Sequence, residues 1–210
     1  MLELGRGLTH RLLAIPSYAI AALLLLMLYV VQAEIRFGAK ARAMRGGASD
    51  RLSTGALSFA LAVPALGLAL SIRGRMPITL PGMPATAWVG VVLGSSGFLL
   101  RLWSLLLLRE RFTRTLLIQQ GQKIERTGPY RFIRHPGYLG SLLCLNGIGL
   151  ASGNTLVVTA SIIVTGAAYG YRIRVEDAML IRAFGEAYES YRRSTGALIP
   201  WLLLRRKEDG

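Results

Sequence analysis

The densest cluster of polar and aromatic residues reads Gly128-Pro129-Tyr130-Arg131-Phe132-Ile133-Arg134-His135-Pro136-Gly137-Tyr138-Leu139-Gly140. Because proline disfavours a helix interior but suits a first turn, we expect a loop that leads into a helix at Pro136. Backbone N–H groups at that helix start, beside Arg134 and His135, would suit an anionic group. Tyr130 and Tyr138 offer aromatic faces to an adenine or a sulfonium. The alternative is that the charged pair binds lipid headgroups and the tyrosines form an interfacial belt.

Arg172 and Glu176 form a second candidate pair, four residues apart, directly after a long uncharged run. In a helix this spacing puts both side chains on one face. Arginine can hold a carboxylate through two parallel hydrogen bonds, and Glu176 or His135 could accept a proton. The alternative is an ordinary ion pair, worth about 0.2–0.5 kcal/mol.

Long apolar runs surround these motifs and predict membrane helices, since a span needs about 20 mostly apolar residues. Two runs without a charge cover residues 12–33 and 52–72, and a third, 85–108, contains a single charge. A fourth run, 135–171, is uncharged and is expected to break at Ser152-Gly153-Asn154 into a hairpin of two short helices. We therefore predict an all-α, polytopic membrane protein with about five transmembrane helices.

The chain is basic, with 25 Lys and Arg against 11 Asp and Glu, a net charge of +14. In a soluble protein this excess would suggest nucleic-acid binding. Here the charges cluster between alternate apolar runs, so the positive-inside rule puts the N-terminus outside and both motifs in the cytoplasm. We expect contacts with membrane lipids and none with nucleic acid. Only 3 of the 25 basic residues are lysine, which favours a bacterial inner membrane protein.

The remaining features concern how the helices pack. Residues 172–193 read as one amphipathic helix that lies in the cytoplasmic interface. With no linker or repeat, one domain is expected over residues 1–210. Three glycine pairs predict close helix packing, namely Gly90/Gly94, Gly149/Gly153 and Gly166/Gly170. Cys144 is expected to be an inert, buried hydrophobe.

Arg101 is the single charge of the third apolar run. A charge inside a membrane span usually faces protein or water. One interpretation is a contact with a substrate cavity or with a partner such as Glu110 or Glu125. The other is a side chain that extends towards the cytoplasmic edge of the membrane.

Taken in order, His-Pro-x-Tyr at 135–138, Arg-x-x-x-Glu at 172–176 and Phe-Gly-x-x-Tyr at 184–188 resemble the isoprenylcysteine carboxyl methyltransferase family. This family of membrane methyltransferases includes phospholipid-methylating relatives, and the similarity extends over residues 99–200, about half of the chain. The resemblance implies S-adenosylmethionine as cofactor, in a cytoplasmic pocket closed by the C-terminal helix. It implies a lipophilic acceptor that arrives from the bilayer and no metal. Residues 1–108 would then supply transmembrane helices and residues 109–210 the catalytic core.

The resemblance also implies roles for individual residues. Arg172 is expected to face the acceptor and, with Glu176 and Arg134, to form the catalytic set. Residues 122–125 depart from the family's usual His-x-Leu pattern, and Asp177 stands where a second Glu is common. The residues expected to line the cofactor site are Gln122, Lys123, Ile124, Glu125, Tyr130, His135, Pro136, Gly137, Tyr138 and Glu176.

Methyl transfer from a sulfonium is a direct displacement, so the protein chiefly aligns donor and acceptor in a dry pocket. A carboxylate acceptor needs no general base, whereas an amine or hydroxyl acceptor does. We predict methyl transfer to the carboxylate of an isoprenylcysteine-like substrate. The alternatives are a phospholipid, amine or thiol methyltransferase, an NADPH-dependent membrane sterol or enone reductase, and a non-enzymatic membrane scaffold.

Overall fold

The structure is a computed structural model that describes residues 25, 62–67, 85–108 and 124–200. The element order is α3 (Ala85–Leu108), the short 3-10 helix η2 (Gly128–Arg131), α4 (Pro136–Ala151), α5 (Thr155–Phe184) and α6 (Glu186–Ser194). Extended pairing within these ranges is limited to one isolated parallel bridge, between Ile133 and Gly196. The prediction of an all-α protein is therefore confirmed for the described part of the chain.

Two of the described helices, α3 and α5, are long and apolar enough to cross a membrane. Both present large exposed apolar side chains, such as Val92 and Leu99 on α3 and Ile162 and Ile163 on α5. Such surface is what a helix turns towards lipid. The predicted spans 12–33 and 52–72 lie outside the described residues except for residues 25 and 62–67. The membrane prediction is thus supported, while the number of five spans stays a prediction.

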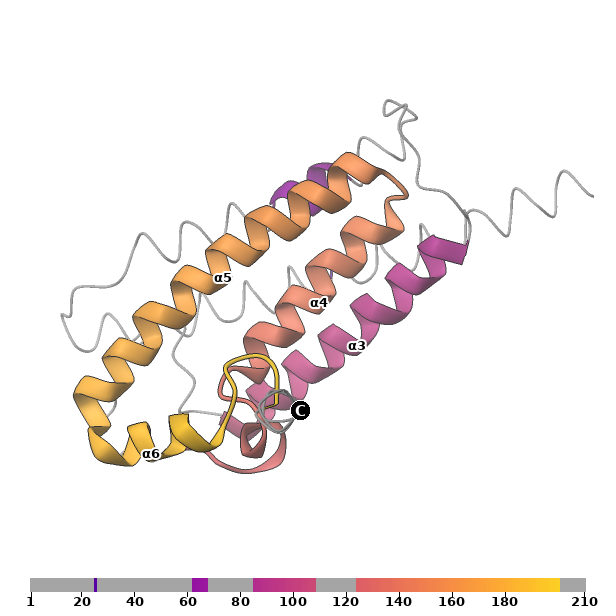
Figure 1. Cartoon of the computed structure of the whole chain (residues 1–210). Coiled ribbons are helices and arrows are strands. Elements are labelled where there is room, and N and C mark those ends of the chain that lie inside the picture. Colours follow the sequence, from indigo (N-terminus) through magenta and orange to yellow (C-terminus); the bar gives the residue numbers. More distant parts are fainter. Residues whose placement is uncertain (1–24, 26–61, 68–84, 109–123, 201–210) are drawn as a thin grey trace, which may run out of the picture.

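Helices α3 and α4 pack side by side through their glycines (Figure 1). A Cβ atom built on Gly90 would lie 2.6 Å from the backbone of α4, and one built on Gly140 would lie 2.6 Å from the backbone of α3. One built on Gly147 would collide with the backbone of Gly94. The packing predicted for Gly90 and Gly94 is therefore confirmed, because only residues without a side chain allow the two backbones to approach so closely.

The other two glycine pairs behave differently from the prediction. Gly149 packs against Ser161, but Gly153 adopts a φ of 69° in the turn between α4 and α5. Gly166 and Gly170 have no atom of a described neighbour within 4 Å of a built Cβ. For this last pair, the described residues offer no close helix contact, and its packing stays a prediction.

The predicted hairpin break at residues 152–154 is confirmed. Helix α4 ends at Ala151, and α5 begins at Thr155, but only α4 is short as expected, with 16 residues against 30 in α5. Gly153 supplies the left-handed turn, and the Asn154 side chain accepts hydrogen bonds from the N–H groups of Leu156 and Val157. An asparagine in this position satisfies backbone donors that the first turn of a helix leaves unpaired.

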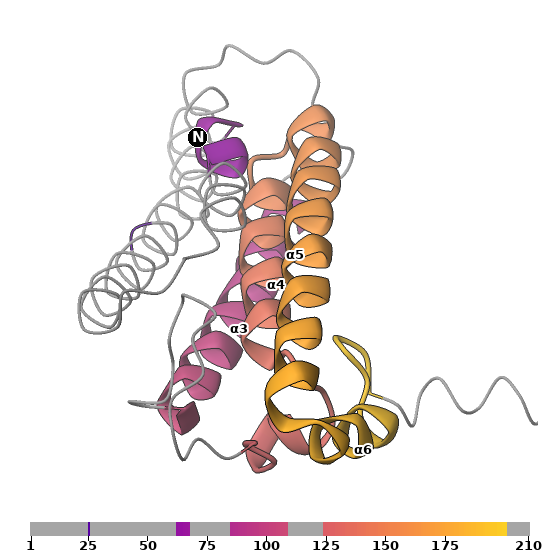
Figure 2. The same ribbon diagram turned by 90° about the vertical axis from the view of Figure 1, so that its left-hand side faces the viewer.

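The single helix predicted over residues 172–193 is wrong. Its first half continues α5 as far as Phe184, and Gly185, at a φ of 53°, ends that helix. The chain then turns sharply, and α6 lies across the end of α5 (Figure 2). Only α6 has the expected amphipathic character, with Tyr188 and Tyr191 buried on its inner face. A positive φ is readily available to glycine alone, so one residue determines where the helix breaks.

The core lies between α4 and α5 and includes Cys144, which is fully buried as predicted. Arg101 is also buried, at 5% exposure, and its guanidinium donates hydrogen bonds to the Gly137 carbonyl, at 3.0 Å, and to the Ser141 hydroxyl. Arg101 therefore faces protein, in contact with α4, as the first interpretation requires. Of its two suggested acidic partners, Glu110 lies outside the described residues.

Candidate functional site

The loop before α4 is held against the segment that follows α6. The N–H of Arg134 donates to the Gly196 carbonyl at 2.8 Å, and the N–H of His135 donates to the Ala197 carbonyl at 3.1 Å. Pro136 occupies the first turn of α4, as predicted. The N–H groups of Arg134 and His135, just before the helix, are thus paired with carbonyls, and in the first turn of α4 the N–H groups of Tyr138 and Leu139 donate to the His135 carbonyl. The anion site expected at this helix start stays a prediction.

Aromatic side chains attach the same loop to α3 and α6. The Tyr191 hydroxyl donates to the Tyr130 carbonyl at 2.6 Å, and the Arg126 guanidinium lies 5.4 Å from the centre of the Tyr191 ring. The Tyr130 hydroxyl points back to the Ser104 carbonyl in α3, at 3.5 Å. Burial raises the pKa of the Tyr130 hydroxyl well above its usual range. Tyr130 is thus buried, at 7% exposure, and contacts both α3 and α6.

Asp177 in α5 joins three separate parts of the chain. Its Oδ1 accepts hydrogen bonds from His135 Nε2 at 2.9 Å and from the Tyr188 hydroxyl at 2.5 Å. Its Oδ2 accepts from the Arg134 guanidinium at 3.2 Å. Arg134 also donates to the carbonyls of Arg192 and Thr195 at the end of α6. The carboxylate therefore connects the loop, α5 and α6.

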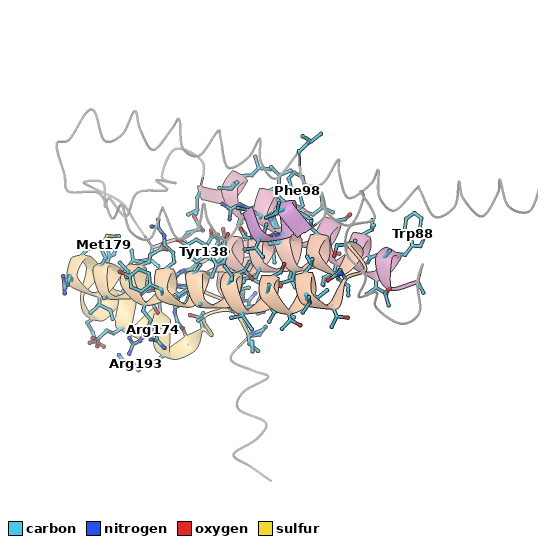
Figure 3. All side chains as sticks on the ribbon, turned by 90° about the horizontal axis from the view of Figure 1, so that it is seen from above. Trp88, Phe98, Tyr138, Arg174, Met179 and Arg193 are labelled. Atoms are coloured by element: carbon cyan, nitrogen blue, oxygen red, sulfur yellow. The ribbon has the colours of Figure 1, made fainter. Side chains whose placement is uncertain are left out.

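Tyr138 in α4 links the two members of the predicted Arg172 and Glu176 pair. Arg172 Nε donates to the Tyr138 hydroxyl at 3.1 Å, and this hydroxyl donates to Glu176. The Tyr138 ring is stacked on the His135 ring with centroids 5.4 Å apart and an interplanar angle of 9°. Figure 3 shows Tyr138 towards the Met179 end of the bundle, with Trp88 at the opposite end. The start of α4, the second half of α5 and the loop thus bring these chemical groups together.

The structure brings together most of the predicted site. Arg134, His135, Tyr138, Arg172 and Glu176 form one connected cluster. Pro136 and Gly137 lie beside it at the start of α4, and the Gly137 carbonyl accepts from Arg101.

The tetrad at residues 122–125 has a different outcome. Gln122 and Lys123 lie outside the described residues, and Ile124 is half-buried. Glu125 is a turn residue, because its Oε1 accepts from the N–H groups of Arg126 and Thr127 and from the Thr127 hydroxyl. Within the described part of the tetrad, these contacts give Glu125 a local structural role.

Sequence reasoning missed three residues of the site, Asp177, Tyr188 and Tyr191. The first was noted only as a departure from a family pattern, although an acid directly after Glu176 is a signal that two carboxylates leave the helix on neighbouring faces. The two tyrosines reach the cluster because the chain turns at Gly185. No spacing rule for a continuous helix predicts that contact.

Comparison with protein families matches residues 85–187 to the phospholipid methyltransferase family. The matched range begins with α3 and includes Arg134, His135, Tyr138, Arg172 and the two carboxylates of α5. This part of the chain, just under half of its length, is thus similar to that family. The resemblance to membrane methyltransferases drawn from the sequence motifs is therefore confirmed.

Curated relatives of the phospholipid methyltransferase region have two kinds of name. A probable protein-S-isoprenylcysteine O-methyltransferase from Oryza sativa subsp. indica is 29% identical over 118 residues, 55% of this chain and 62% of the relative. The cobalt-zinc-cadmium resistance protein CzcN from Cupriavidus metallidurans is 38% identical over 121 residues, 57% of this chain and 50% of the relative. The chain thus spans less than two thirds of the length of either.

The fold is similar to a solved structure of a eukaryotic intramembrane Ras methyltransferase, isoprenylcysteine carboxyl methyltransferase. The TM-score is 0.56 at 22% sequence identity, and the match covers 69% of this chain and 52% of the other. This likeness concerns the fold, which is a helical arrangement in both proteins.

Proposed function

We propose that the chain is a membrane-embedded methyltransferase that uses S-adenosylmethionine and methylates the carboxylate of a lipophilic, isoprenylcysteine-like acceptor. The observation that carries the proposal is the buried Arg172–Tyr138–Glu176 chain of hydrogen bonds beside His135, inside the region that matches the family. Arg172 is 1% exposed and its neighbour His135 is 5% exposed. A cluster of polar groups excluded from water at one end of a membrane bundle is costly without a function.

The residues present fit S-adenosylmethionine. The compound carries an amino group and a sulfonium, which suit a carboxylate and aromatic faces. Glu176 keeps 25% of its side chain exposed, and the rings of His135, Tyr138 and Tyr169 lie next to one another. The Nε of Arg134 is buried without a hydrogen-bond partner among the described residues, and so retains a donor for an acidic or hydroxyl group. When bound, the compound supplies an electrophilic methyl group.

Arg172 is suited to hold the carboxylate of the acceptor. Its guanidinium is fixed through Tyr138, so little side-chain freedom is lost when a carboxylate binds. The burial of Arg172 also removes water from that carboxylate, which favours attack on a methyl group. A carboxylate oxygen attacks as the free anion, so no residue of the site has to take up a proton. Glu176 and His135 would act as bases only with an amine, hydroxyl or thiol acceptor.

The charge of the site bears on the choice of acceptor. The named relatives include isoprenylcysteine O-methyltransferases and proteins of cobalt, zinc and cadmium resistance. Among the described residues, no three His, Cys, Asp or Glu side chains are grouped as metal ligands. The buried arginine favours an anionic acceptor, and this observation supports a carboxylate over an amine.

Calorimetry with S-adenosylhomocysteine on the detergent-purified chain tests the proposal. We expect saturable binding by the parent protein and its loss in His135→Ala, with helix content unchanged in both. Thermal shift with NADPH gives the contrast with a reductase, since NADPH should not stabilise the protein. Absence of S-adenosylhomocysteine binding in a folded parent protein would overturn the proposal, and stabilisation by NADPH would favour the reductase.

A further inference from the structure

Asp177 is not a member of the buried arginine chain, yet it is in direct contact with the ring of His135. Its side chain is 14% exposed, and its two oxygens accept from His135, Tyr188 and Arg134. A carboxylate with three donors of this kind is well satisfied and holds each donor in place. The contact with His135 has a chemical consequence that the other two contacts lack.

An ionised carboxylate only accepts hydrogen bonds, so the His135 nitrogen that faces it must carry a proton. That nitrogen is Nε2, at 2.9 Å from Asp177 Oδ1. In a neutral imidazole the other nitrogen, Nδ1, then carries a lone pair. Asp177 therefore determines which face of the ring donates and which accepts.

The accepting nitrogen faces a second acceptor. His135 Nδ1 lies 4.0 Å from Glu176 Oε2, which is too far for a direct hydrogen bond. One donor group could lie at roughly 2.8 Å from both atoms and bond to each. A positively charged donor fits best, because one of the two acceptors is a carboxylate.

We propose that Asp177 is a positioning residue that keeps the His135 proton on Nε2 and so maintains His135 Nδ1 and Glu176 as a paired acceptor for one cationic donor group. The identification of that group as the amino group of the methyl donor rests on the proposed function, whereas the position of the His135 proton is independent of it. Two further contacts hold the residue, since the stack on Tyr138 fixes the plane of the ring and the bond from the backbone N–H of His135 to the Ala197 carbonyl fixes the backbone.

The tautomer can be observed directly, because the chain has only two histidines, His10 and His135. The measurement is ¹⁵N NMR of the full chain in detergent, with labelled histidine rings, at an alkaline pH where imidazoles are neutral. The His10→Gln variant shows which signals belong to His135. We expect a single Nε2–H tautomer for His135. In Asp177→Asn the side chain offers a donor as well as an acceptor, so we expect a mixture. A parent ring with its proton on Nδ1, or on both nitrogens, would overturn the proposal.

Two variants separate positioning from a purely structural role. Tyr188→Phe removes a donor to Asp177 but leaves the contact with His135, so the tautomer should stay unchanged. If Asp177 had only a structural role, Asp177→Asn and Tyr188→Phe would change the tautomer to the same extent. Asp177→Glu keeps a group that only accepts hydrogen bonds, so His135 should have the Nε2–H tautomer as in the parent protein. This variant provides a test even if Asp177→Asn does not fold.

Binding of S-adenosylhomocysteine gives the second measurement. Loss of the ordered acceptor pair in Asp177→Asn should weaken binding about 10-fold to 100-fold. Glu186→Gln removes an acid of α6 whose side chain is 75% exposed, and should leave binding unchanged. If the parent protein binds no S-adenosylhomocysteine, the proposed function fails and the tautomer result stands. Unchanged tautomer and affinity in Asp177→Asn would overturn the role of Asp177.

Discussion

The Tyr191 hydroxyl in α6 donates a hydrogen bond to the backbone carbonyl of Tyr130, 61 residues earlier in the chain. Together with the Arg126 side chain, which donates to the Ala187 carbonyl and lies over the Tyr191 ring, this bond fixes α6 against the loop. The loop that carries His135 and the helix that carries Tyr188 thus form one structural unit. Anything that releases α6 should also release the site.

Alkaline pH should loosen this unit. Burial raises the pKa of the Tyr191 hydroxyl from 10.0 to about 12 and moves the pKa of Tyr188 upwards as well, for the same reason. Above pH 10 the unfolded chain loses these protons and the folded chain retains them, so stability is lost as the pH rises. The expected slope is about 1.4 kcal/mol per pH unit for each such tyrosine. Thermal unfolding measured at a series of pH values above 10 checks this prediction. In Tyr191→Phe, stability should fall less steeply with pH than in the parent protein.

Arg172→Ala should reduce turnover of a carboxylate acceptor about 100-fold or more, because the acceptor loses its charged partner. Arg172→Lys keeps the charge without the fork of two parallel donors, so it should recover only part of the activity. Steady-state methylation of a farnesylcysteine analogue measures the effect. Arg174→Ala, an exposed arginine on the same helix, is the matched control. Full activity of folded Arg172→Ala would exclude this arginine from acceptor binding.

Glu176→Gln should weaken S-adenosylhomocysteine binding about 10-fold, the usual effect of removing the charge from a charge-assisted hydrogen bond. The isosteric amide still accepts from Tyr138, so the Arg172 chain and the fold should persist. Calorimetry provides the affinity. Glu189→Gln, in α6 and 42% exposed at its side chain, is expected to bind as the parent does. Equal affinities for both variants would remove Glu176 from the cofactor site.

Two glycine variants should change stability in opposite directions. Gly147→Ala places a methyl group against the backbone of Gly94 and should force α3 and α4 apart, at a cost of about 1–3 kcal/mol. Gly166→Ala meets no described atom within 4 Å and should gain up to about 1 kcal/mol from helix propensity. Unfolding of both proteins in the same detergent by heat or denaturant compares them. A stable Gly147→Ala protein would contradict the close packing of the two helices.

Local signals in the sequence predicted the start of α4 and the hairpin turn correctly. Pro136 fixes a backbone angle and lacks a donor, and Asn154 caps a helix, so each acts on its own neighbours. Gly185 could not be recognised as a helix break, because the apolar pattern continues past it and a single glycine is compatible with a helix. The break becomes evident only from the buried contacts that α6 makes after the turn.

The same distinction applies to the site. The spacing of Arg172 and Glu176 placed both on one face, but their link through Tyr138 joins two helices and is a tertiary contact. The N–H groups of Arg134 and His135, directly before the start of α4, are paired with the carbonyls of Gly196 and Ala197. Those carbonyls lie about 60 residues further along the chain, and no local rule connects them to the loop.

The pairing of the loop with residues 196 and 197 has a consequence for biosynthesis. Helices α3, α4 and α5 can enter the membrane and pack as soon as they leave the ribosome, since domains assemble from the N-terminal side during synthesis. The N–H groups of Arg134 and His135 must wait for the Gly196 and Ala197 carbonyls, which are translated after all of α6. A nascent chain therefore acquires its bundle first, and the loop that carries His135 can be paired only after residue 197 has been translated.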